Sequence, residues 1–108
     1  MDETWELTQM TRIEIVISGE DVAVAEDLFS GAGARGFTVV PNVSGLGHSG
    51  HHQGRLLFNQ RDGLTLLTVV LPPERAGALL EGLRSLLANR SGVMLVSDTW
   101  VSRPEYFQ

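Results

Sequence analysis

The chain has 108 residues, 43% of them hydrophobic and 19% charged, with a formal net charge of −5 at pH 7. These proportions favour one globular domain over a disordered chain, and the acidic balance argues against nucleic-acid binding, which needs a basic surface. No apolar run approaches the ~20 residues of a membrane span, and the lack of cysteine excludes disulfides and thiolate chemistry.

Residues 1–10 are polar and acidic, and we interpret them as an N-terminal extension to a single domain over residues 11–108. Three isoleucines, Ile13, Ile15 and Ile17, alternate with other residues, which is the spacing of a strand with one apolar face. The sequence Gly19-Glu20-Asp21 then begins a helix, because acidic residues suit its N-terminal dipole. Its apolar face holds Val22, Ala25, Leu28 or Phe29, and Ala32.

Residues 36–43 predict the second strand, in which Pro41 indicates an edge position or a bulge. The segment 44–62 follows as a Gly/His-rich loop with four of the twelve glycines and all three histidines. Hairpin loops usually have about 2–5 residues, so a loop of this length suggests a function. Glycine allows positive φ and a close approach to a ligand, which makes the loop a candidate binding and switching element.

Residues 64–71 form a dense apolar run that predicts a central strand. Pro72 and Pro73 begin the second helix, and Asn89-Arg90-Ser91-Gly92 end it before a last strand over residues 93–102. The helix has its apolar residues three and four positions apart, at Ala76, Leu79, Leu80, Leu83, Leu86 and Leu87. The order βαββαβ predicts an α+β, ferredoxin-like fold: a four-stranded antiparallel sheet with two helices on one face.

The second face of this sheet is expected to be apolar as well. If the isoleucines of the first strand face the helices, Val16, Leu67, Val96 and Trp100 are expected on the opposite side. An uncovered face of that kind predicts a partner surface, most simply another copy of the chain.

Titratable and small residues leave several interpretations of the loop open. Gly45 and Gly47 fit either simple turns or a nest of backbone amides that binds an anion. The histidines fit exposed loop side chains, a metal site or pH-linked contacts, although the adjacency of His51 and His52 is poor for one metal ion. All eight basic residues are arginines, so a Walker-type lysine is excluded and bound phosphate requires arginine. No catalytic arrangement stands out, and we do not expect an enzyme.

Three segments, residues 12–15, 36–40 and 43–47, resemble the PII signal-transduction family, whose corresponding stretch reads like GMTVTEVKGFG. The resemblance implies a homotrimer with nucleotides in the clefts between subunits. Carried over by position, the residues implied to bind nucleotide are Thr38, Gly45, Leu46, Gly47, Arg90, Gly92 and Arg103. His48 and Ser49 stand where the family usually has Arg and Gln.

The chain departs from classical members in three places, one of which is the Arg-x-Arg pair that usually follows the last strand: only Arg103 lies near it. The loop is short and lacks their modified tyrosine, and the Gly-rich turn before the last strand is reduced to residues 89–93. Fewer phosphate ligands favour ADP or AMP over ATP. These features are similar to the carboxysome-associated PII-like subgroup, which implies bicarbonate as a second effector, at Gly47, His48, Ser49 and Gly50.

The resemblance therefore implies a cytoplasmic regulatory protein of inorganic-carbon or carboxysome metabolism. Its implied partners are small-molecule effectors and a bicarbonate transporter or carboxysome component, without nucleic acid or membrane insertion. Two other classes stay open: a CutA-like trimeric metal-binding protein, and a small structural or assembly protein of the same fold.

Overall fold

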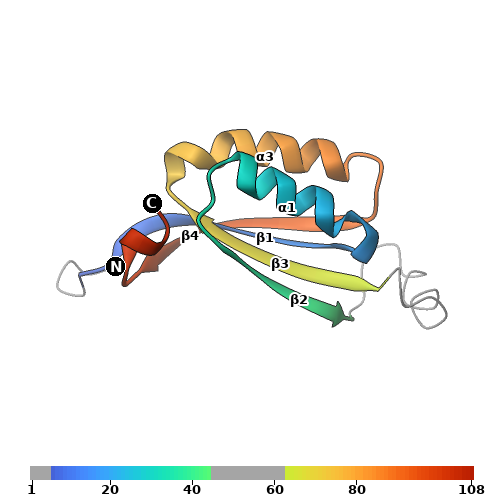
Figure 1. Cartoon of the computed structure of the whole chain (residues 1–108), viewed down its shortest axis with the longest axis horizontal. Helices are drawn as coiled ribbons and strands as arrows, with labels where there is room; N and C mark the ends of the chain where they lie inside the picture. The colour runs from blue at the N-terminus through green and yellow to red at the C-terminus, as the bar shows by residue number, and fades with distance from the viewer. Residues whose placement is uncertain (1–5, 45–62) are drawn as a thin grey trace.

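The computed structural model describes residues 6–44 and 63–108. Its elements are β1 (Thr8–Ser18), the 3-10 turn η2 (Gly19–Asp21), α1 (Val22–Gly31), β2 (Phe37–Val43), β3 (Leu64–Leu71), α3 (Pro73–Leu87), β4 (Gly92–Val101) and the 3-10 turn η4 (Pro104–Tyr106). The strands form one antiparallel sheet in the order β2-β3-β1-β4. Both helices lie on one face of it (Figure 1), which confirms the predicted α+β, ferredoxin-like architecture.

The core lies between this sheet face and the helices. The three isoleucines of β1 are 0% exposed, as their alternation predicted, and Phe29 of α1 and Leu83 of α3 pack with them. Phe29 also contacts Phe37 of β2, with ring centroids 5.3 Å apart. Burying side chains of this size is the main stabilising contribution to the fold, at roughly 1.5–3 kcal/mol for each large apolar residue.

The start of β1 differs from the sequence prediction, whereas the irregularity in β2 agrees with it. β1 begins at Thr8, which pairs with Val101, and Met10 is 2% exposed, so residues 8–10 belong to the sheet rather than to an extension before it. In β2 the register shifts between Pro41 and Val43, and Asn42 has a φ of 61°. β2 is also an edge strand, so both features that Pro41 indicated are present.

The predicted second face was wrong for three of its four residues. Leu67 pairs with Ile15 and Val96 pairs with Ile13, so both lie on the helix side of the sheet, and Trp100 shares the side of Val96. Leu67 is buried in the core, whereas Val96 and Trp100 are 48% and 37% exposed on the edge strand β4. The reason for the error is that β3 and β4 carry apolar residues at both alternating positions, so periodicity does not reveal which set is buried.

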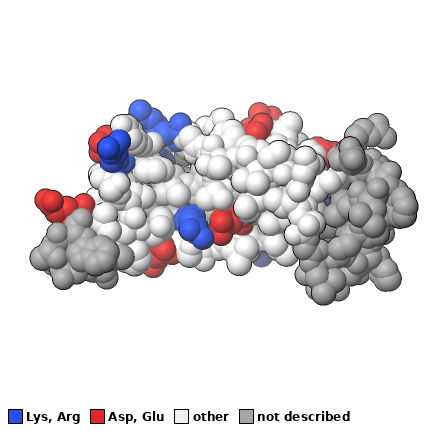
Figure 2. Space-filling model, turned by 90° about the horizontal axis from the view of Figure 1, so that it is seen from below, with Lys and Arg blue, Asp and Glu red and all other residues white. Residues whose placement is uncertain are grey.

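The sheet face turned away from the helices, here called the far face, is nevertheless apolar. One row of paired residues crosses all four strands, and the neighbouring Leu95 is 57% exposed. Figure 2, which shows the molecule from this side, has a largely uncharged surface with charges of both signs side by side near its middle. The row consists of Val40, Leu66, Val16 and Val93.

Candidate functional site

Arg90 lies in the turn between α3 and β4, at the end of the sheet where β1 finishes and β3 begins. The turn is closed by a hydrogen bond from the Arg90 amide to the Leu87 carbonyl oxygen, 3.2 Å long. The Gly19 amide donates to the Gly63 carbonyl oxygen at 2.8 Å, which joins the end of β1 to the residue before β3. Arg90 and Gly63 therefore lie at the same end of the sheet.

The Arg90 side chain is held by a carboxylate. Its Nη1 donates to Oδ1 of Asp21 at 2.6 Å, and the side chains are 49% and 6% exposed respectively. Asp21 is the last residue of η2, 69 positions earlier in the chain. The ion pair therefore fixes the α3–β4 turn against the connection between β1 and α1, and it leaves part of the guanidinium open to solvent.

Gly92, which follows in the same turn, has a fold-based reason to be glycine. Its φ is +154°, and a Cβ there would lie 2.9 Å from the Val16 carbonyl oxygen and 2.8 Å from Cδ2 of Leu87. The backbone approach between β4 and β1 at this point excludes any side chain. Packing against β1 therefore requires glycine at position 92, whether or not Gly92 also binds nucleotide as predicted.

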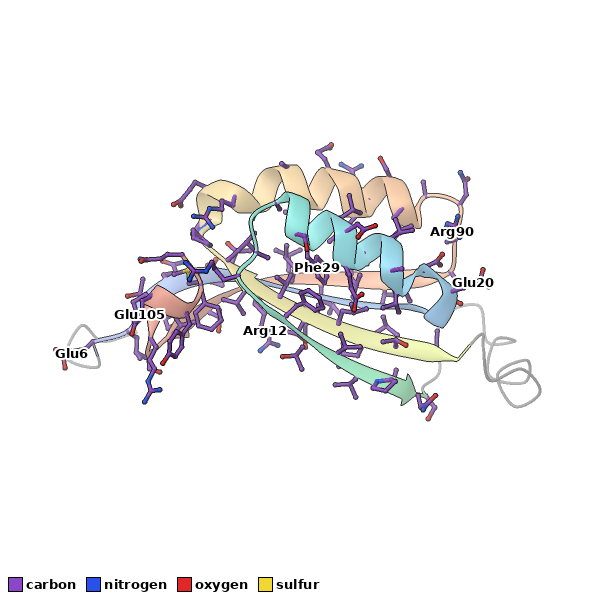
Figure 3. All side chains as sticks on the ribbon, viewed as in Figure 1. Glu6, Arg12, Glu20, Phe29, Arg90 and Glu105 are labelled. Carbon is purple, nitrogen blue, oxygen red and sulfur yellow. The ribbon has the colours of Figure 1, made fainter. Side chains whose placement is uncertain are left out.

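Arg103 lies at the other end of the sheet. It follows β4, whose ten residues separate it from Arg90 by about 30 Å of extended chain. Its guanidinium carbon lies 5.8 Å from the centroid of the Tyr106 ring, and Arg35 Nη1 donates to the Gln108 carbonyl oxygen at 3.1 Å. Figure 3 shows Arg90 near Glu20 at one end, with Glu105 of the C-terminal turn at the opposite end. One copy of the chain cannot bring both arginines to the same phosphate.

Thr38 lies on the far face, on the edge strand opposite β4. It pairs with Thr68, which pairs with Glu14, so these polar residues form a row beside the apolar one. Glu14 accepts hydrogen bonds from Arg12 Nη2 at 3.0 Å and from the Thr68 hydroxyl at 3.5 Å. The structure thus separates Thr38 from both arginines within one copy and associates it with a polar network that the sequence interpretation did not single out.

The remaining predicted site residues, Gly45, Leu46, Gly47, His48, Ser49 and Gly50, lie outside the described residues. In the described part of the chain, no three histidine, aspartate or glutamate side chains gather in a way that could hold a metal ion. Neither helix within residues 6–44 and 63–108 is long and apolar enough to cross a membrane.

The sequence interpretation missed Asp21 and Glu14. Arg12 and Glu14 are two positions apart in a predicted strand, which places them on one face, so their contact could have been anticipated. Asp21 was interpreted only as an acidic residue that suits the N-terminal dipole of the first helix. Its partner is 69 positions away, and no local pattern reveals a contact over that separation.

A family model and a solved structure both match nearly the whole chain. The family model described as nitrogen regulatory protein P-II matches residues 10–106. The solved structure of CPII, a nitrogen regulatory PII-like protein from Thiomonas intermedia K12 bound to ADP, AMP and bicarbonate, is 39% identical. That match has a TM-score of 0.84 and covers 94% of this chain and 95% of the other.

Two further solved structures match the chain, one at a similar and one at a much lower sequence identity. CPII from the same organism bound to ADP, AMP and acetate is 36% identical, with a TM-score of 0.77 and coverage of 94% and 96%. CutA from Synechococcus elongatus PCC7942 is 14% identical, with a TM-score of 0.61 and coverage of 94% and 93%, which shows a shared fold alone. No curated protein sequence matches the chain.

Proposed function

The chain belongs to the nitrogen regulatory P-II family, as a PII-like regulatory protein, and from this premise we propose that it is a homotrimer that binds ADP or AMP together with bicarbonate. The observation that carries the proposal is the 39% identity, over nearly the full length of both chains, to a protein solved with these three ligands. In this role the protein responds to its ligands by changing its contacts with other proteins and performs no catalysis.

The positions of the two arginines support a site between subunits. Arg90 and Arg103 lie at opposite ends of the ten-residue strand β4, so they can serve one nucleotide only if they come from two copies of the chain. In the proposed cleft, the α3–β4 turn of one copy faces the C-terminal turn of its neighbour. Arginine suits this task because its planar group donates two parallel hydrogen bonds to phosphate oxygens.

The far face supports the association of copies. Val93 and Leu95 on β4 are 46% and 57% exposed, and Val40 on β2 is 42% exposed, so one copy alone leaves this apolar surface in contact with water. A contiguous apolar face on a small protein usually marks an interface. We place the contact between copies there, with Thr38 and the Glu14 network beside it.

Bicarbonate is assigned to the segment that includes Gly47, His48, Ser49 and Gly50, on the sequence alone. Bicarbonate and acetate, the anions in the two CPII structures, share a planar group with two oxygens on one carbon. Consecutive glycine amides can bind such a group. A role in inorganic-carbon metabolism in the cytoplasm, with a bicarbonate transporter or a carboxysome component as partner, depends on this assignment.

Calorimetric titration tests the proposal and its alternative together. We expect saturable binding of ADP and AMP, weaker binding of ATP, and no binding of adenosine at the same concentrations, since phosphate supplies much of the attraction. Binding of Cu²⁺ or Zn²⁺ without any nucleotide binding would instead favour the CutA-like function. Absence of both would leave the structural or assembly class.

A further inference from the structure

Asp21 occupies the position that caps α1 but does not cap it. It precedes Val22, the first residue of the helix, and its side chain makes no capping hydrogen bond. Aspartate at this position normally accepts a hydrogen bond from the amide of the second or third helical residue. Here the carboxylate is instead used by Arg90, at 2.6 Å, and only 6% of the Asp21 side chain is exposed.

The contact is asymmetric in a way that suits ligand binding. The carboxylate is buried on the protein side, whereas the Arg90 side chain is 49% exposed. A guanidinium carries five N–H donors, and the hydrogen bond to Asp21 uses one on Nη1. Because the Arg90 side chain is 49% exposed, its guanidinium can be reached by an anion from solvent, while Asp21 fixes the direction in which it points.

Arg90 lies in an exposed turn, and its long side chain is held by the carboxylate of Asp21. The turn from Ala88 to Ser91 is exposed and lies between α3 and β4. A long arginine side chain in such a turn loses conformational entropy when it binds a ligand, and a contact that orders it beforehand reduces that loss. The neighbouring Gly92 lies against the backbone of β1, where a Cβ would be 2.9 Å from the Val16 carbonyl oxygen, so the turn packs closely on the strand that leads to Asp21.

We propose that Asp21 is a positioning residue that orders the Arg90 guanidinium for the phosphates of the bound adenine nucleotide. The inference rests on the proposed function and adds a specific partner to it. It assigns a ligand-linked role to a buried carboxylate that does not cap α1 and whose hydrogen bond goes to Arg90.

The test is the affinity of the purified full-length protein for ADP, AMP and adenosine in the variant Asp21→Asn. Asparagine keeps the size of the side chain and removes its charge. We expect ADP and AMP to bind about fivefold more weakly, the effect of ordering one long side chain on binding instead of beforehand. The variant Glu20→Gln removes an exposed charge from the same turn (Figure 3) and is expected to change affinity less than about twofold.

A double-mutant cycle separates positioning from a general structural effect. In an Arg90→Gln background, Asp21→Asn should cause no further loss of ADP affinity, because the group that Asp21 orders is absent. Equal losses in both backgrounds, unchanged affinity in Asp21→Asn, or tighter ADP binding in that variant would each overturn the inference. Binding of ADP by the wild-type protein in these cases would leave the proposed function intact, whereas failure of the wild type to bind would refute the function itself.

The variant Asp21→Ser guards against misfolding, since serine is a good helix-capping residue that lacks the charge. It should keep the circular-dichroism spectrum of the wild type and show the same fivefold loss for ADP. If both variants at position 21 fail to fold, the carboxylate is needed for the fold rather than for positioning, and the inference is wrong.

Discussion

Gly92 combines a φ of +154° with a Cβ position 2.9 Å from the Val16 carbonyl oxygen, so a side chain there requires the backbone to move. We expect Gly92→Ala to lower the free energy of unfolding by about 1–3 kcal/mol, the usual range for local backbone strain. Chemical denaturation measures the change. Gly77→Ala in α3 is the matched control, because nothing lies within 4 Å of its Cβ, and it should instead stabilise the protein by about 1 kcal/mol.

A neutral or stabilising effect of Gly92→Ala would show that the turn adjusts without cost. In that case the requirement for glycine at position 92 would have to come from the ligand. Nucleotide affinity of the folded variant then becomes the informative measurement.

Arg103 is predicted to contact nucleotide phosphate from the neighbouring copy. Arg103→Ala should weaken ADP binding at least about tenfold, since a charge-assisted hydrogen bond contributes roughly 1.5–3 kcal/mol. Calorimetry gives the affinity, and Arg84→Ala, which removes an exposed arginine from α3, is the control that should leave it unchanged. Equal ADP affinity in Arg103→Ala and wild type would refute the assignment of Arg103 while leaving the fold unaffected.

Single residues were predictable from the sequence to different degrees. Arg90, Gly92 and Arg103 were predicted from their positions around the last strand in a family resemblance, and their role in nucleotide binding stays a prediction. Asp21 did not, because its burial depends on a contact that only the folded chain creates. The same is true of the packing that requires glycine at position 92.

The edge strand β4 decides how copies of the chain can associate. Leu95 lies on its far face, opposite Glu14, and is 57% exposed. We expect Leu95→Asp to convert the trimer to species near the monomer mass of 11.8 kDa, because a carboxylate in a dry interface loses its hydration without gaining a partner. Light scattering at micromolar concentration measures the mass.

Val24→Asp is the control for that experiment. Val24 is 49% exposed on α1, a comparable exposure on the opposite side of the molecule, and its replacement should leave the mass unchanged. A trimer that persists in Leu95→Asp would mean that the far face is not the contact between copies.

The order of the elements and most of their bounds were predictable from alternation and helical spacing. The isoleucines of β1 and the apolar stripe of α3 each have one clear periodicity, and both were placed in the core correctly. β3 and β4 carry apolar residues at both alternating positions, so their faces were not predictable and the assignments of Leu67, Val96 and Trp100 were wrong. Pairing with β1 settles the faces, and this is a property of the whole sheet.

At the scale of the whole molecule, the proposed nucleotide site requires more than one copy of the chain, because the two predicted phosphate ligands lie at opposite ends of β4. We also predict that the nucleotide and the anion each raise the affinity of the protein for the other. The glycines of the segment 44–62 raise the entropy cost of ordering this segment around a ligand. If the first ligand orders the segment, the second ligand binds with a smaller loss of entropy and therefore more tightly. By linkage, each ligand must tighten the other by the same factor.

The most direct measurement is a calorimetric titration of ADP into the purified protein, with and without bicarbonate, at fixed pH and ionic strength. We expect saturable ADP binding in both buffers and tighter binding with bicarbonate, while an equal concentration of chloride has no such effect. Equal ADP affinity in bicarbonate and chloride would contradict the coupling. Absence of ADP binding in every buffer would contradict the proposed function as a whole.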